Sequence, residues 1–185
     1  HGILFNHEGT KRGEEFVTRK ITKGVAKIKS SIDNEEDFEP ISLGNLKCKR
    51  DWSDSEDFVR GVWLMLNQKK PKDYILASGE THSIREFVEK AFDAAKIKGD
   101  WLELENIKGP DGVFLADPLL TKYIHRGTGK SLVVVDPKFF RPAEVNLLLG
   151  DPTPAIRELM WRRTTSFEQL VKKMVKHDIE ENEKK

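Results

Sequence analysis

Short runs of cationic residues are the feature of this chain that most suggests chemistry. They are Lys11-Arg12, Arg19-Lys20, Lys49-Arg50 and Arg141. Arginine offers a planar fork of donors that matches phosphate oxygens, so cations brought together from separate elements would hold a diphosphate. Spacing alone leaves a second interpretation open, in which these residues are unrelated solvated charges.

Histidine and cysteine give weaker indications. His7 ends an apolar run, and sites in α/β proteins form at the carboxyl ends of strands. A lone histidine is more often a structural hydrogen-bonding residue. Cys48 is the one cysteine, which excludes an internal disulfide, and no Cys/His spacing indicates zinc. This usage fits a reducing, cytoplasmic setting.

A glycine-rich segment, residues 127–131, resembles the end of a phosphate-binding P-loop. The motif requires glycine where Ile124 stands, and it requires a helix where residues 132–135 have the β-branched pattern of a strand. We therefore interpret the segment as a turn that leads into a strand.

Two signatures of dinucleotide oxidoreductases are missing from the printed sequence. It contains no G-x-G-x-x-G. The residues four positions after Tyr74 and Tyr123 are Ser78 and Gly127, so neither tyrosine has the lysine of a Tyr-x-x-x-Lys pair. Neither tyrosine therefore has the neighbour that would lower its pKa for proton transfer.

Composition limits the remaining classes. The chain has 185 residues, 37% of them hydrophobic and 34% charged, with a formal net charge of +1. Such a balance favours a soluble globular protein with no overall attraction to nucleic acid or membrane surfaces. No apolar run reaches the roughly 18 residues that a membrane span needs.

Elements that would position the cations alternate along the chain and predict an α/β fold. Strands are expected over residues 2–7, 41–43, 74–77 and 131–136. One helix is expected from Glu14. Four more are expected to begin at N-caps, which are Ser53, Ser83, Thr153 with Pro154 at the first helical position, and Ser166. Residues 30–40 are expected to form an exposed loop, and residues 99–130 are assigned little structure. In the helix after Ser53, the residues expected to face the core are Phe58, Val59, Val62, Trp63 and Leu66.

Ordered strings of residues resemble the GDP-mannose 4,6-dehydratase family almost from end to end. The matching segments are residues 2–8, 12–13, 16–21, 42–46, 49–52, 79–80, 82–83, 85–92, 135–137, 140–145 and 149–152. The family belongs to the extended short-chain dehydrogenases. Its members use NADP to convert GDP-mannose to GDP-4-keto-6-deoxymannose, a step towards GDP-fucose and related deoxyhexoses.

The resemblance implies a specific place for this chain in that fold. Residues 1–185 would form the C-terminal, substrate-binding portion, including the last strand or strands of a Rossmann sheet. The N-terminal NADP-binding domain, with the catalytic Tyr-Lys and Thr-Glu pairs, would be absent. The chain alone is then expected to be inactive, with the N-terminal half as its partner, in a cytoplasmic homo-oligomer. Residues 2–5 would form an exposed apolar edge unless another chain covers them.

Family positions carry over to binding residues. His7 and Arg12 match positions that contact NADP. The positions that hold the GDP-sugar are matched by Asn6, Val17, Lys20, Asn45, Arg50, Arg141 and Glu144. No metal ligand is implied. Two alternatives remain open, a non-catalytic nucleotide-sugar-binding module and a scaffold protein whose pocket has decayed.

Overall fold

The computed structural model describes residues 1–102, 107–108, 114–115, 121–140 and 145–184. Its α-helices are α1 (Val17–Asp33), α2 (Ser55–Leu66), α3 (Ile84–Ala94), α4 (Thr153–Leu159) and α5 (Phe167–Asn182). A 3-10 helix, η2, spans Pro137–Phe139. The strands before α3 are β1 (Gly2–Leu4), β2 (Asn6–Glu8), β3 (Ile41–Leu43), β4 (Lys49–Arg50), β5 (Trp52–Asp54), β6 (Tyr74–Leu76) and β7 (His82–Ser83). Those that follow are β8 (Gly99–Leu102), β9 (Ile107–Lys108), β10 (Phe114–Leu115), β11 (Lys122–His125), β12 (Ser131–Val135) and β13 (Leu147–Leu148).

The strands form several small sheets of mixed direction, as expected for an α/β protein. The largest has the order β3-β12-β11-β8, with β3 and β12 parallel and the other pairs antiparallel. A three-stranded sheet has the order β13-β4-β7. The pairs β1-β6 and β2-β5 are parallel, and β9-β10 is antiparallel.

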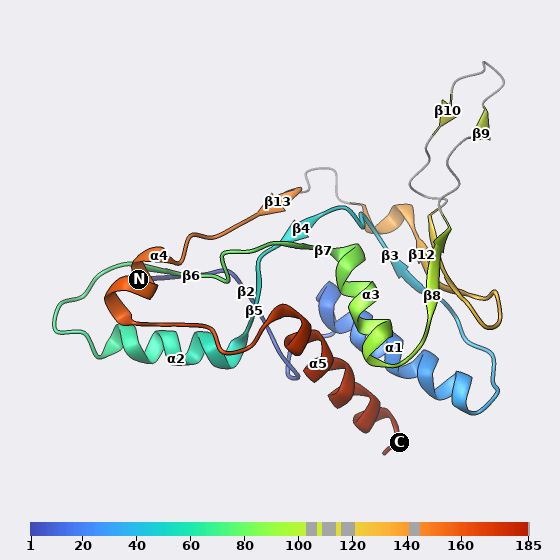
Figure 1. Cartoon of the computed structure of the whole chain (residues 1–185), viewed down its shortest axis with the longest axis horizontal. Coiled ribbons are helices and arrows are strands. Elements are labelled where there is room, and N and C mark those ends of the chain that lie inside the picture. Colours follow the sequence, from blue (N-terminus) through green and yellow to red (C-terminus); the bar gives the residue numbers. More distant parts are fainter. Residues whose placement is uncertain (103–106, 109–113, 116–120, 141–144, 185) are drawn as a thin grey trace.

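The larger hydrophobic core lies between three helices and the four-stranded sheet. Helices α1, α3 and α5 lie side by side in Figure 1, and their buried faces meet at residues such as Val25, Phe87 and Met174. Leu132 and Val133 of β12 are fully buried in the same cluster. This core fixes α1, which carries two of the predicted binding residues, Val17 and Lys20.

A smaller core lies at the other end of the molecule, where α2, α4 and β6 meet (Figure 1). Trp161 is 1% exposed, stands edge-on to Phe58 at 6.0 Å between ring centroids, and donates its indole N–H to the carbonyl oxygen of Asp57 at 2.8 Å. Leu76 of β6 completes the cluster. This core holds the β1-β6 pair in place beneath α2.

Helix starts agree with the sequence at two of the four expected N-caps. Ser83 and Ser166 each form a capping box, because each hydroxyl accepts from a backbone N–H three residues on and that residue's side chain returns the bond. Ser53 does not cap α2, since it lies within β5 and Asp54 accepts from the backbone N–H of Glu56 instead. Thr153 is the first residue of α4 rather than its N-cap.

The extents of other elements also differ from expectation. The run over residues 2–7 forms two strands that break at Phe5, and α1 begins at Val17 and continues to Asp33, into the segment expected to be a loop. Residues 99–130 contain β8, β9, β10 and β11, so the expectation of little structure there was wrong. The glycine turn at residues 127–131 does lead into β12, as expected.

Helix α2 departs from the sequence prediction on its core face. Phe58 is 1% exposed, as expected, whereas Val59, Trp63 and Leu66 are 69%, 61% and 79% exposed. Apolar residues surround much of this helix, and only the face with Phe58 and Gly61 meets β6 and Trp161.

Within the described residues, no helix is long and apolar enough to cross a membrane.

Candidate functional site

The predicted cofactor and substrate residues begin on β2, which pairs with β5. Asn6 lies opposite Trp52 and His7 opposite Ser53 in this parallel pair. The His7 ring is exposed, stacks on Phe58 at 5.4 Å, and has its Nδ1 2.9 Å from the carbonyl oxygen of Phe5. That contact orients the ring and leaves Nε2 as the polar edge that a ligand would meet.

Arg12 is attached to β2 by a buried carboxylate. Its Nε lies 3.2 Å from Oε2 of Glu8, and its guanidinium lies 3.5 Å above the ring of Phe16. Glu8 is 2% exposed and also accepts a hydrogen bond from Thr18 at 2.5 Å. Burial raises the pKa of Glu8, against the opposing effects of Thr18 and Arg12. The loop between β2 and α1 is therefore fixed with the Arg12 side chain 20% exposed.

Lys20 lies one turn into α1 and reaches the segment after β12. Its ammonium nitrogen is 3.4 Å from the ring centroid of Phe139 in η2. Burial and the nearby Lys138 lower the pKa of Lys20, while Asp136 opposes them. An anion bound beside Lys20 and Lys138 would favour the charged form of Lys20.

Arg50 approaches the chain just beyond that segment. Its Nη1 donates to the carbonyl oxygen of Val145 at 2.5 Å and to that of Lys49 at 2.9 Å. The strand beneath it is in register with β13 and β7, so that Arg50 lies opposite Leu148 and His82. The guanidinium is thus set by backbone carbonyls from two segments.

Asn45 lies in the turn between β3 and β4, and its side-chain oxygen accepts from the backbone N–H of Lys47 at 3.0 Å. A Cβ on the preceding Gly44 would collide with the carbonyl of Phe139, so this turn packs directly on η2. Arg141 and Glu144 lie outside the described residues. Among the described residues that flank them, Phe139 contacts Lys20 and Val145 contacts Arg50.

One cation of the predicted runs serves the fold instead. Arg19 is 5% exposed and pairs with Asp178 of α5 at 2.8 Å and with Glu181 at 3.3 Å. It also donates to the carbonyl oxygen of Thr10. Arg19 and Lys20 are adjacent in sequence but point about 100° apart around α1, which explains why one is internal and the other faces the predicted site.

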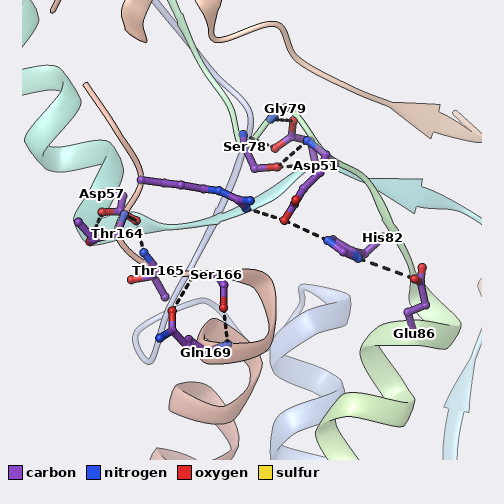
Figure 2. A network of polar contacts seen from close by, with 12 residues as sticks. Asp51, Asp57, Ser78, Gly79, His82, Glu86, Thr164, Thr165, Ser166 and Gln169 are labelled. Carbon is purple, nitrogen blue, oxygen red and sulfur yellow. Dashed lines mark hydrogen bonds and ion pairs between the residues drawn. The ribbon is translucent and has the colours of Figure 1, made fainter. Parts of the chain in front are cut away.

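Several residues that shape this region stand out only in the structure. Phe139 under Lys20 and Glu8 beside Arg12 are two of them. A third is Asp51, which follows Arg50 and has no exposed surface. Figure 2 shows the backbone of Ser78 and Gly79 directed at the Asp51 carboxylate.

Comparison with known proteins places the chain in a family. The family model described as GDP-mannose 4,6 dehydratase matches residues 1–174. The chain belongs to the GDP-mannose 4,6-dehydratase family. A GDP-mannose 4,6 dehydratase of Dictyostelium discoideum is 48% identical over 181 residues, which cover 97% of this chain and 46% of that protein. The enzyme of that name from Drosophila melanogaster is 47% identical, with 97% and 41% covered.

The chain therefore spans less than half the length of these relatives in the dehydratase family.

Two solved structures have folds similar to that of this chain. RMD from Pseudomonas aeruginosa, complexed with NADPH, has a TM-score of 0.71 at 18% identity, covering 97% of this chain and 48% of that one. A Thermus thermophilus UDP-glucose 4-epimerase in complex with NAD has a TM-score of 0.64 at 17% identity, with 96% and 45% covered.

Proposed function

We propose that this chain supplies the GDP-mannose-binding part of a GDP-mannose 4,6-dehydratase. The observation that carries the proposal is the position of two cations from separate elements. Lys20 on α1 and Arg50 on β4 contact the two described ends of the segment that contains Arg141 and Glu144. Convergent cations are suited to a diphosphate, because charged hydrogen bonds to phosphate are stronger than neutral ones.

The roles of the individual residues follow from their chemistry. Lys20, Arg50 and Arg141 neutralise the diphosphate of the GDP-sugar, and Glu144 accepts from a sugar or guanine donor. Asn6, Val17 and Asn45 line the same pocket. The Arg50 guanidinium, held by two backbone carbonyls, is oriented before the ligand arrives, which reduces the ordering cost of binding.

For NADP, the chain offers only a partial set of contacts. The exposed His7 ring and the Arg12 guanidinium fit one edge of the cofactor, with Arg12 suited to the 2′-phosphate. Arg12 is already paired with buried Glu8, so its side chain is positioned by the fold rather than by the cofactor. When bound, NADP would supply the hydride chemistry of the reaction. Proton transfer and elimination would fall to the Tyr-Lys and Thr-Glu pairs of the N-terminal part of such an enzyme.

The partner of this chain would be the N-terminal NADP-binding half of the same kind of enzyme. All three residues of β1 are exposed, and among the described residues β1 pairs only with β6. Parallel sheets are normally larger and covered on both faces. The parallel pair β1-β6 is therefore expected to be part of a larger sheet that the partner completes. Val59, Trp63 and Leu66 on α2 add an apolar stripe at the same end of the molecule.

Assembly in a cytoplasmic homo-oligomer forms part of the same proposal. The cytoplasmic setting is supported by the low cysteine content, with Cys48 the one cysteine of the sequence, and the oligomer by the exposed apolar residues of α2.

Complementation tests the proposal. The chain would be co-expressed with the N-terminal half of the Dictyostelium relative, and GDP-mannose consumption would be followed with NADP present. The proposal predicts turnover from the pair and none from either part alone. A second pair, identical except for Trp63→Glu in this chain, tests whether the apolar stripe of α2 docks the N-terminal half. Trp63 is suitable because it lies outside the predicted substrate residues. A stable complex that binds neither GDP-mannose nor NADP would contradict the proposal.

A non-catalytic nucleotide-sugar-binding module is the second candidate. The lack of a lysine four residues after Tyr74 or Tyr123 fits this function and the proposed part of an enzyme equally. The two functions differ in the complementation experiment, since the module would bind GDP-mannose without giving turnover in any combination.

A further inference from the structure

The structure points to Asp51 as a residue that holds the Arg50 side chain in place for its ligand. Asp51 directly follows Arg50 at the end of β4, and it has no exposed surface. A carboxylate removed from water in this way is stable only where hydrogen-bond donors replace the water. Its donors therefore show which parts of the chain it holds.

Three backbone N–H groups from two other segments bond the Asp51 carboxylate. Ser78 donates to Oδ1 at 2.7 Å, and Gly79 donates to Oδ2 at 3.1 Å (Figure 2). Gly150 donates to Oδ2 at 3.3 Å from the segment that follows β13. Gly79 has a φ of +77°, a conformation that favours glycine.

The bond from Gly150 matters because β13 is otherwise weakly held. Its ladder with β4 contains two residue pairs, and Val145, Leu147 and Leu149 are each more than half exposed. A Cβ on Gly150 would collide with the side chains of Ala77 and Phe5, so only glycine brings this backbone close enough. Asp51 thus fixes the far end of the segment at residues 145–150.

The near end of the same segment carries the carbonyl that orients Arg50. Val145 accepts from Arg50 Nη1 at 2.5 Å, and the backbone N–H of Lys49 donates to the carbonyl oxygen of Asn146 at 2.8 Å. We propose that Asp51 is a positioning residue for the nucleotide-sugar site: it sets the 145–150 segment on β4, and that segment holds the Arg50 guanidinium. The proposal rests on the function proposed above and names a residue that acts through Arg50 rather than on the ligand.

Asp57 offers a matched control for Asp51. It is 2% exposed and likewise accepts backbone N–H groups, from Thr164 at 2.9 Å and Thr165 at 3.0 Å. It also accepts from the Thr164 hydroxyl at 2.7 Å. These bonds fix the segment before α5, and none of them is made to Asp51 (Figure 2). Asp57→Asn and Asp51→Asn therefore remove the same charge from equally buried sites with different consequences for Arg50.

Nuclear magnetic resonance of the complete, isotope-labelled chain tests the positioning role. Asp51→Asn should speed amide exchange at Gly150 by about tenfold or more and shift the guanidinium signal of Arg50, whereas Asp57→Asn should change neither. Unchanged Arg50 and Gly150 signals in Asp51→Asn, or equal changes in Asp57→Asn, would overturn the proposal. Should Asp51→Asn fail to fold, an ester in place of the Leu149–Gly150 peptide bond removes the Gly150 N–H, and with it the exchange signal, and should still shift the guanidinium signal of Arg50.

GDP-mannose titration of the same proteins completes the experiment. Asp51→Asn should raise the Kd about tenfold, and Asp57→Asn less than twofold. If the unsubstituted protein binds no GDP-mannose, with or without the N-terminal half, the proposed function fails, and the resonance comparison still decides whether Asp51 positions Arg50. Equal affinities in the two variants would contradict the positioning role.

Discussion

Replacing Arg19 by methionine should destabilise the protein strongly and in a way that depends on pH. The guanidinium of Arg19 and the carboxylate of Asp178 join α1 to α5 at 2.8 Å, with side chains only 6% and 1% exposed. Asp178 also accepts from the Thr22 hydroxyl at 2.6 Å. Methionine keeps much of the volume of arginine but leaves a buried carboxylate without its cation.

The expected loss follows from that unpaired charge. Breaking a buried ion pair on one side costs about 3–5 kcal/mol of unfolding free energy. Burial already raises the pKa of Asp178, even though Arg19 opposes it, so removing Arg19 should raise it further. The folded state then takes up a proton more readily than the unfolded state. Stability of the variant should therefore fall as pH rises above the ordinary aspartate pKa towards the raised value.

Urea unfolding at pH 5, 7 and 8 measures this effect. Arg19→Met should lose about 3–5 kcal/mol at pH 7 and clearly less at pH 5, and Arg19→Met/Asp178→Asn should recover part of the loss. Lys29→Met on the same helix is the control, because the Lys29–Asp33 pair is exposed and should contribute less than about 1 kcal/mol. A loss below about 1 kcal/mol in Arg19→Met, or a loss independent of pH, would refute the reasoning.

Three further predictions concern the β2 loop, the phosphate site and the apolar stripe. Glu8→Gln should flatten the decline of stability above the ordinary glutamate pKa in chemical denaturation, because burial raises the pKa of Glu8 in the folded state; an unchanged profile would show that Glu8 does not titrate there. Arg50→Ala should weaken GDP-mannose binding by about 1.5–3 kcal/mol in calorimetry. Arg126→Ala is the control, because Arg126 is exposed and pairs with Asp100, and it should leave that affinity unchanged. Equal losses of affinity in the two variants would show that Arg50 does not belong to the pocket. Trp63→Lys should reduce self-association of the isolated chain in analytical ultracentrifugation, and identical sedimentation of the two proteins would exclude the stripe as an adhesive surface.

Local signals predicted much of the framework correctly. The capping boxes at Ser83 and Ser166 depend on side chains three residues apart, so they can be recognised in the sequence. The β-branched run of β12 was equally clear because it is buried on both sides. Periodicity failed on α2, where apolar residues occupy more than one face and only the packing of Trp161 and Leu76 selects the buried one.

Residue type singles out candidates for the site in the sequence, but it does not show how they are arranged. Cationic runs drew attention to both Arg19 and Lys20, yet only the tertiary contact with Asp178 shows that Arg19 is internal. Asp51 carries no sequence pattern, because its donors come from residues 27 to 99 positions away. Long-range polar contacts of this kind have no local spacing, which is why the sequence could not reveal them.

The central claim is that the chain holds GDP-mannose, and calorimetric titration tests it most directly. GDP-mannose and UDP-glucose would be titrated into the chain, first alone and then with the N-terminal half of the Dictyostelium relative. The proposal predicts that GDP-mannose binds at least about tenfold more tightly than UDP-glucose, a difference of about 1.4 kcal/mol. Equal affinity for the two nucleotide sugars, or no binding of either even with both halves present, would contradict it.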